Sequence, residues 1–476
     1  MADTVRIRVS MAVSAVVAAA AMVMAVQGDQ GARAASPGDG LTRTTSTPAT
    51  PVLSPRRVPA LIAQPVGERR LAASLDGVWS RHSSSSCLVV AEGTHVLYER
   101  QPDQAVIPAS SLKLLTASVA LRRLGPDARL VTTVRSAAGP GGGIVRGDLW
   151  LVGGGDPVLG TKGWADQRTH QPPLTSSLEL LADRVVAAGV REVRGRVLGD
   201  DSRYDSNRSV ASWPRRYLDD HEIGPLSALT VNDGFATWEP EPVPFDDPAG
   251  GAAAVFTELL RARGVVVAGD PAGGTAPAGS VEIAQLASPT VAELVADLIR
   301  ESDNGTAELL VKELGVRSSA EGSTVAGLKV IAASLREMGV APEGIHLVDG
   351  SGLDPTNRIT CTALQELAAA MDAGGPIDRG LAVAGFSGTL TKRFLDSPAK
   401  GRLRAKTGSL NHVAALVGRV EGGSGTVLTF TQVVNDIDTL AVGRRLQDDL
   451  GAVLAGYPDV PALDALAPLA PVRARP

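Results

Sequence analysis

The segment IPASSLKLLTASVALRRLG, residues 107–125, decides the fold. Apolar residues recur along it at helical spacing, and Gly125-Pro126 supplies the expected stop, so it predicts an amphipathic helix. Ser110 and Lys113 stand three residues apart at its start, which places their side chains on one face about a turn apart. A serine there lies at the positive end of the helix dipole, where an anionic intermediate is stabilised. The pair is therefore a candidate nucleophile and base.

The same spacing also has a plainer interpretation. A serine at a helix start commonly caps the helix, and a lysine commonly extends to water. The stretch SPAK, Ser397 to Lys400, matches equally well but has no continuing apolar face, and we interpret it as a surface turn. The Ser-x-x-Lys spacing alone is therefore weak evidence for catalysis.

Two further motifs follow in the chain. Ser302-Asp303-Asn304 lies at the junction of two helical patterns, where a hydroxyl and an amide can relay protons and bind a substrate amide. Lys406-Thr407-Gly408-Ser409 lies in a strand-like run and offers a cation, two hydroxyls for a carboxylate, and a glycine that permits close approach. Each also fits an ordinary role, a helix stop or an edge-strand lysine. In this order, the three motifs are the signature of penicillin-binding proteins and serine β-lactamases.

Composition limits the class of protein. The chain has 476 residues, 44% of them apolar, which is too long for one core and predicts two folded units with tails. Its net charge of -5 and its aromatic content of 3% argue against a nucleic-acid partner. Two cysteines, Cys87 and Cys361, exclude a disulfide-dense scaffold and a cysteine-rich metal site. They can form one disulfide, but we expect two buried free thiols.

The first 34 residues have the layout of an export signal. Arg6 and Arg8 precede an apolar run from Val9 to Val26, and Ala32-Arg33-Ala34 is a candidate cleavage site. The run also approaches the length of a membrane anchor. A cleaved signal and an uncleaved anchor both place the body of the protein outside the cytoplasm. We therefore expect an extracytoplasmic protein, with possible membrane attachment through this segment.

The pattern along the chain predicts several parts. A strand hairpin at 87–100 precedes the helix, and two strand-like runs at 402–422 and 426–435 lie near the end. Strands at both ends predict one shared sheet with an α+β insertion between them. The expected parts are a signal peptide or anchor (1–34), a disordered Pro/Thr/Ser-rich linker (35–72), a sheet domain (73–130 and 288–456), an inserted α+β domain (131–287) and a flexible tail (457–476).

The stretches around the motifs resemble the class C low-molecular-mass penicillin-binding proteins, the D-alanyl-D-alanine carboxypeptidase/endopeptidase family. The resemblance runs from about residue 75 to 455; its stretches include PASSLKLLTA, GDLWLVGGGDPVL, ESDNGTAELLVKELG, DGSGLDPTNRIT, GFSGTLTKRF and RAKTGSL. It implies the α+β penicillin-binding fold, a five-stranded antiparallel sheet flanked by helices and interrupted by an insertion. It also implies peptidoglycan peptides ending in D-Ala-D-Ala as substrates, acylation by β-lactam antibiotics, and no metal or organic cofactor.

The resemblance implies a role for each motif residue. Ser110 attacks the carbonyl between two D-alanines after Lys113 takes its proton, and the oxyanion lies between the N–H groups of Ser110 and Ser409. Ser302 passes a proton to the leaving amine, Asn304 holds the peptide, and the third motif faces the terminal carboxylate. The implied catalytic residues are Ser110, Lys113 and Ser302, and the implied substrate-binding residues are Asn304, Lys406, Thr407, Gly408 and Ser409.

Two alternative functions stay open: a β-lactamase-like hydrolase on the same fold, and a catalytically silent scaffold of the cell envelope. The motifs do not distinguish a carboxypeptidase from an endopeptidase, because both substrates present a D-alanyl carbonyl. Outside the motifs, we expect Asp156 to be a turn residue and Asp349 to Arg358 to give structural support, since both lie among turn formers.

Overall fold

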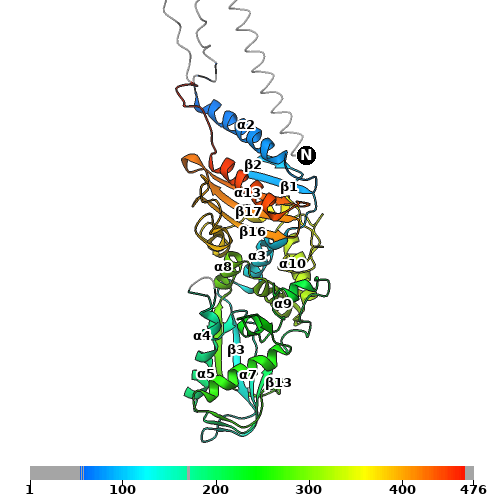
Figure 1. Ribbon diagram of the computed structural model, residues 1–476, viewed down its shortest axis with the longest axis vertical. Helices are drawn as coiled ribbons and strands as arrows, with labels where there is room; N and C mark the ends of the chain where they lie inside the picture. The colour runs from blue at the N-terminus through cyan, green and yellow to red at the C-terminus, as the bar shows by residue number, and fades with distance from the viewer. Residues whose placement is uncertain (1–53, 55, 57, 169–171, 467–476) are drawn as a thin grey trace, which may run out of the picture. The chain divides into compact units, whose positions relative to one another are not determined.

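The main sheet has six strands, all antiparallel, in the computed structural model, which describes residues 54, 56, 58–168 and 172–466 (Figure 1). Its strands, in sheet order, are β15 (Ala382–Val383), β16 (Leu403–Leu410), β17 (Val413–Glu421), β18 (Val427–Val434), β1 (Ser86–Glu92) and β2 (His95–Arg100). β1 pairs with β18 from Ser86 opposite Val434 to Glu92 opposite Leu428, which confirms a sheet shared by both ends of the chain. The α+β class is also confirmed. The expected count of five strands is wrong, because the two-residue β15, too short to show a periodic pattern, adds a sixth.

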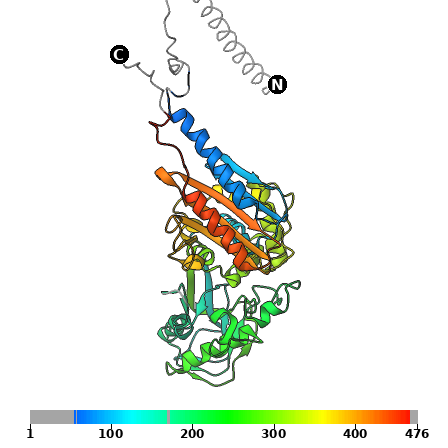
Figure 2. The same ribbon diagram turned by 45° about the horizontal axis from the view of Figure 1, so that its top comes forward.

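Helices cover both faces of this sheet. α2 and α13 lie side by side on one face, where Leu75 and Leu454 share a core with Leu88 of β1 (Figure 2). Val89, the next residue, points to the opposite face and its core, as the two-residue period of a strand requires. The helices are α2 (Ala60–Trp79), α3 (Lys113–Leu124), α8 (Val291–Glu301), α9 (Asn304–Ser319), α10 (Thr324–Glu337), α11 (Cys361–Ala369), α12 (Pro376–Gly380) and α13 (Leu440–Ala455).

α3 confirms the helix predicted from the opening segment. Leu114, Ala117 and Leu124 are buried in the core between the sheet and the helices of that face. Gly125, with φ of 91°, ends the helix and donates its N–H to the Leu121 carbonyl at 3.2 Å. The apolar face of α3 therefore fixes the start of the helix, with Lys113, against the sheet.

A second sheet lies within residues 129–290, between α3 and α8 in the chain. Leu149 and Leu151 of its strands pack with Leu181 of α5 and Phe256 of α7 in a separate core. In sheet order its strands are β13 (Ala272–Gly273), β9 (Val197–Asp200), β5 (Leu149–Val152), β3 (Arg129–Ser136) and β14 (Val281–Thr290). Beside it are α5 (Leu178–Ala187), α7 (Pro248–Arg261), the short helices α4 (Lys162–Ala165) and α6 (Arg216–Asp219), and a small parallel sheet of β12 (Val266–Val267), β8 (Glu192–Val193) and β4 (Ile144–Val145).

The two cysteines form a disulfide, so the expectation of free thiols is wrong. Cys87 of β1 and Cys361 of α11 are both buried, with their sulfurs 2.12 Å apart. They are separated by 274 residues in sequence. Their pairing follows from the packing of α11 against the sheet, which local sequence patterns do not reveal.

Three boundaries differ from the sequence prediction. α2 begins at Ala60, inside the expected linker 35–72, because Leu71 and Leu75 provide an apolar face despite Pro65 within the helix. The expected tail from 457 starts as packed structure, since Tyr457 is buried and Arg70 pairs with Asp459 at 3.1 Å. The run 402–422 forms two strands, β16 and β17, rather than one.

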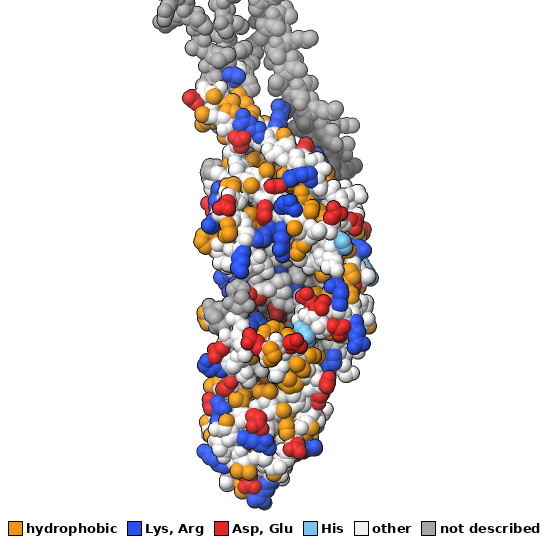
Figure 3. Space-filling view, viewed as in Figure 1, with side chains coloured by type: hydrophobic (Ala, Val, Ile, Leu, Met, Phe, Trp, Pro, Cys, Tyr) orange, Lys and Arg blue, Asp and Glu red, His pale blue; other side chains and the backbone are white. Residues whose placement is uncertain are grey.

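The expected signal peptide or anchor, residues 1–34, lies outside the described residues. Within the described part of the chain, no helix is both long and apolar enough to cross a bilayer. Acidic and basic side chains are interspersed over the face of the molecule shown in Figure 3.

Replacing both cysteines by alanine should lower the free energy of unfolding by about 2–5 kcal/mol, because the disulfide closes a long loop in the unfolded chain. Chemical denaturation of the wild type and of the Cys87→Ala/Cys361→Ala variant measures this difference. As a control, unreduced wild type should expose no thiol to a thiol reagent in denaturant. Recovery of two free thiols there would contradict the disulfide.

Candidate functional site

Ser110 lies in a 3₁₀ turn, Ala109–Leu112, that leads directly into α3. This turn is pressed against a neighbouring loop: Ala109 has φ of 48°, and a Cβ on Gly352 would lie 2.0 Å from the Ala109 carbonyl. Only glycine fits at position 352, where φ is 81°. Ser110 faces a cleft, whereas Ser111 is buried and donates its hydroxyl to a main-chain carbonyl at 2.7 Å. The turn therefore exposes the Ser110 side chain to the cleft and buries the Ser111 side chain.

Lys113 is completely buried beside Ser110, and its Nζ has three oxygen neighbours. Ser110 Oγ lies at 2.9 Å, Asn304 Oδ1 at 2.7 Å and the Ser351 carbonyl at 2.7 Å. The two carbonyl oxygens can only accept, so each takes an N–H from Nζ, whereas the hydroxyl of Ser110 can also donate. A neutral Lys113 thus donates its two N–H groups to the carbonyl oxygens and directs its lone pair at the Ser110 hydroxyl.

Two buried lysines set the electrostatics of the site. Burial lowers the pKa of Lys113 to about 8, against the opposite effect of nearby carboxylates, of which Asp349 is the largest. Lys406 is 1% exposed, and burial together with the charge of Lys113 holds its pKa well below the usual range. With a pKa of about 8, Lys113 exists partly as the free amine near neutral pH, which is the form that can accept a proton.

Ser302 ends α8 and Asn304 begins α9, at the helix junction that the sequence predicts. Ser302 adopts a left-handed φ of 62°, and Asp303 caps α9 by accepting a hydrogen bond from a main-chain N–H of its first turn at 2.6 Å. The turn brings Ser302 Oγ to Lys406 Nζ, which donates to it at 2.7 Å. It also brings Asn304 Oδ1 to Lys113. The second motif therefore contacts both lysines.

β16 carries the third motif past the Ser110 turn. A Cβ on Gly408 would lie 2.8 Å from the Pro108 carbonyl and 3.0 Å from the Ser111 nitrogen, so the strand can come this close only with glycine there. Thr407 Oγ1 is hydrogen-bonded to Thr389 Oγ1 at 2.8 Å. β15 pairs with only two residues of β16, so among the described residues no strand covers the edge beside the motif.

A cleft of about 590 Å³ opens at these residues. Its lining includes five of the eight residues that the sequence predicts for the site: Ser110, Ser302, Asn304, Thr407 and Ser409. The other three are buried beneath its surface: Lys113, Lys406 and Gly408. The structure therefore brings all eight together, from segments up to about 300 residues apart.

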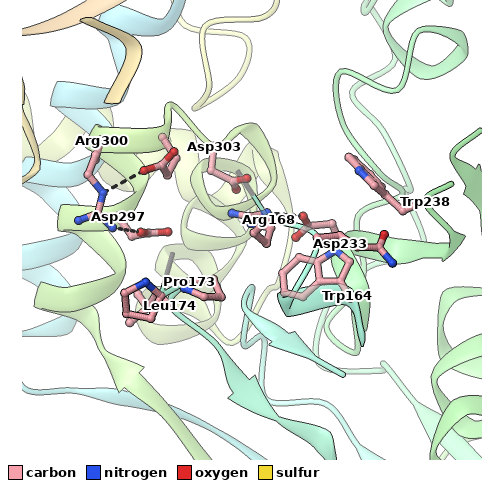
Figure 4. Close-up of a pocket in the computed structure, with 12 residues that line it drawn as sticks. Trp164, Arg168, Pro173, Leu174, Asp233, Trp238, Asp297, Arg300 and Asp303 are labelled. Atoms are coloured by element: carbon pink, nitrogen blue, oxygen red, sulfur yellow. Dashed lines mark hydrogen bonds and ion pairs between the residues drawn. The ribbon is translucent and has the colours of Figure 1, made fainter. Parts of the chain in front are cut away.

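A second hollow, of about 230 Å³, borders the same turn at Asp303. Figure 4 shows its charged lining, in which Arg300 is bonded to Asp297 and Arg168 lies against Asp233, 2.8 Å away. Burial raises the pKa of Asp233 to about 7. None of the eight predicted residues lines this hollow. The cleft, not the hollow, is therefore the candidate active site.

Sequence reasoning missed two contacts of the site. The Ser351 carbonyl belongs to the main chain, so residue type does not mark it, and Thr389 lies in a stretch noted only for its resemblance.

Two other expectations agree with the structure. Asp349 is buried, and its carboxylate accepts four hydrogen bonds within its own loop and from a neighbouring one. Asp156 is buried and accepts from the Val158 N–H at 3.0 Å, as a turn residue does.

A serine with a buried lysine at a helix start, a Ser-x-Asn turn and a Lys-Thr-Gly strand around one cleft define the penicillin-recognising serine enzymes as a class. The chain belongs to the D-Ala-D-Ala carboxypeptidase 3 (S13) family, which its sequence matches over residues 75–244 and 239–456. The predicted family and the predicted enzyme class, a serine-type DD-peptidase, are thereby confirmed.

Curated relatives and a solved structure extend this match. The D-alanyl-D-alanine carboxypeptidase of Actinomadura sp. is 31% identical over 445 residues, covering 76% of this chain and 79% of the relative. Carboxypeptidase DacB of Mycolicibacterium smegmatis is 33% identical over 372 residues, covering 75% and 77%. Penicillin binding protein 4 of Haemophilus influenzae superposes with a TM-score of 0.68 at 18% identity, covering 80% of this chain and 99% of that one. This likeness confirms the penicillin-binding fold.

Gly408→Ala should slow labelling by a fluorescent β-lactam by roughly 100-fold, because its Cβ would push β16 away from the Ser110 turn. Labelling rates under identical conditions measure the effect. Gly147→Ala is the matched control, since a Cβ there meets no atom within 4 Å. Equal labelling of Gly408→Ala and wild type would show that the close approach of β16 is not required.

Proposed function

We propose that this protein is a serine D-alanyl-D-alanine carboxypeptidase that acts on peptidoglycan peptides ending in D-Ala-D-Ala, through an acyl-enzyme on Ser110. One observation carries the proposal: Lys113 Nζ lies 2.9 Å from Ser110 Oγ, while two carbonyl oxygens occupy its other contacts. The family and its named relatives support the same reaction. Endopeptidase activity on cross-linked peptides would use the same site, because that bond also presents a D-alanyl carbonyl.

Acylation follows from the positions of these groups. Ser110 Oγ bonds to the carbonyl carbon as its proton passes to Lys113 Nζ, and the N–H groups of Ser110 and Ser409 stabilise the oxyanion. The C–N bond then breaks, and the leaving D-alanine nitrogen takes the proton that Lys113 accepted, relayed through Ser302, whose Oγ accepts a hydrogen bond from Lys406. Water afterwards hydrolyses the ester and frees Ser110.

Substrate binding uses the opposite wall of the cleft. The terminal carboxylate faces Lys406, Thr407 and Ser409; its negative charge favours the protonated form of Lys406, and the two hydroxyls donate hydrogen bonds to it. Thr389, bonded to Thr407 at 2.8 Å, orients that hydroxyl. Asn304 holds the peptide backbone. A β-lactam antibiotic offers an amide carbonyl and a carboxylate to the same groups, so it would acylate Ser110 as the peptide does.

We also propose where the enzyme works and how its chain is divided into domains. The enzyme works outside the cytoplasm, where its substrate lies, with residues 1–34 as a cleaved export signal or a membrane attachment. We assign residues 73–130 and 288–456 to the catalytic domain and residues 131–287 to an inserted domain. The separate apolar cores of the two sheets support this division.

Ser110→Ala should lower both D-alanine release from peptidoglycan peptides and covalent β-lactam labelling by at least about a thousandfold, because no nucleophile remains. Mass spectrometry of released products and of the labelled protein measures both. Ser111→Ala, one residue away and bonded away from the cleft, should keep labelling. Labelling of Ser110→Ala at the wild-type rate would remove Ser110 as the nucleophile.

Acylation should slow by roughly tenfold for each pH unit below about 8, because Lys113 there gains a proton and can no longer accept one from Ser110. The second-order rate constant of β-lactam acylation, measured between about pH 6 and about pH 10, gives this profile. Circular dichroism over the same range checks that the fold is intact. A rate that is flat or that rises toward low pH would contradict Lys113 as the base.

A further inference from the structure

One segment of the insertion, residues 212–222, bonds to the Asn304 side chain and to the loop that carries Ser351, which together supply the two carbonyl oxygens that accept from Lys113. The Glu222 carbonyl accepts from Asn304 Nδ2 at 2.8 Å, which leaves Asn304 Oδ1 facing Lys113. At the other end of the segment, Trp213 Nε1 donates to Asp349 Oδ2 at 2.9 Å. Asp349 belongs to the loop whose Ser351 carbonyl is the second acceptor. The insertion is therefore bonded to Asn304 directly and to the loop that carries the Ser351 carbonyl through Asp349.

The loop that carries Ser351 is built around the carboxylate of Asp349. Besides the indole of Trp213, this carboxylate accepts from Gly352 N at 2.8 Å, Asp354 N at 2.7 Å and Asn357 Nδ2 at 2.8 Å. Asp349 is fully buried, so its negative charge is stabilised by these hydrogen-bond donors rather than by water. A displaced Asp349 would move the main chain on both sides of it, including the Ser351 carbonyl.

A second buried acid supports the same loop from α9. Glu308 Oε1 accepts from the N–H groups of Gly350 and Ser351 at 2.9 and 2.7 Å. Burial raises the pKa of both Glu308 and Asp349, and the charge of Asp349 raises that of Glu308 further. Asp349 accepts four hydrogen bonds and Glu308 accepts from two N–H groups, so the negative charge of the pair is better stabilised on Asp349, the carboxylate that the Trp213 N–H contacts.

We propose that Trp213 is a positioning residue for the catalytic base: by anchoring Asp349 it fixes the Ser351 carbonyl, and with it the direction of the Lys113 lone pair toward Ser110. The alternative is that Trp213 only fills the core it shares with Tyr204, Tyr217 and Leu309. A residue that only packs would change stability, but it would not change the rate of acylation in folded molecules. The inference rests on the proposed function, in which Lys113 is the base.

The test compares Trp213→Phe with wild type in stopped-flow acylation by a chromogenic β-lactam, which separates the dissociation constant of the first complex from the acylation rate constant. We expect the rate constant to fall roughly 10- to 100-fold, because the base is misplaced, with an unchanged dissociation constant and an unchanged final fraction of labelled protein. Trp150→Phe is the matched control: its indole N–H is also buried in the insertion, but has no hydrogen-bond partner among the described residues.

A wild-type rate constant in Trp213→Phe would overturn the positioning role, even if less of the protein were folded and labelled. If Trp213→Phe does not fold, β-(3-benzothienyl)alanine at position 213 decides, because it keeps the ring shape and loses only the N–H donor. A slowed rate there supports the role, and a wild-type rate overturns it. Ser110→Ala in the same assay separates the two proposals, since labelling of that variant would remove the proposed function itself.

Discussion

Lys113 has no exposed surface, yet its Nζ has three oxygen atoms within 2.9 Å. An amine so deeply buried loses its hydration, and only these oxygens replace the lost water contacts. Ser110, Asn304 and Ser351 supply them from a 3₁₀ turn, a helix start and a loop. The site therefore exists only when these segments pack together, and the same packing lowers the pKa of the amine toward the range in which it can act as a base.

Several features of the fold hold the segments around Lys113 together. Gly352 and Gly408 let a loop and a strand approach the Ser110 turn more closely than any side chain would permit. The sheet joins the two ends of the chain, and the disulfide links α11 to β1, the strand that pairs with β18. The insertion adds further support, because residues 212–222 bond to Asn304 and to Asp349, which lies two residues before Ser351. Segments that are far apart in the sequence thus hold the amine of Lys113 in place.

Local patterns predicted the helix that begins at Lys113, just after Ser110, and the order of three motifs predicted the family. Contacts between distant segments were beyond such patterns: the disulfide joins residues 274 apart. The run 402–422 resembled one strand because its turn is made by His412 in a left-handed conformation with φ of 63°, which composition does not mark. The Ser351 carbonyl was missed for a related reason, since every residue type carries the same main-chain oxygen.

Neutron diffraction from a deuterated crystal at about pH 9, above the pKa of about 8 for Lys113, would show whether Lys113 is the neutral base that faces Ser110. The protonation state of Nζ is then observed rather than inferred from heavy atoms. We expect two deuterons on Nζ, directed at Asn304 Oδ1 and the Ser351 carbonyl, and a deuteron on Ser110 Oγ directed at Nζ. Three deuterons on Nζ, with one directed at Ser110 Oγ, would contradict this expectation.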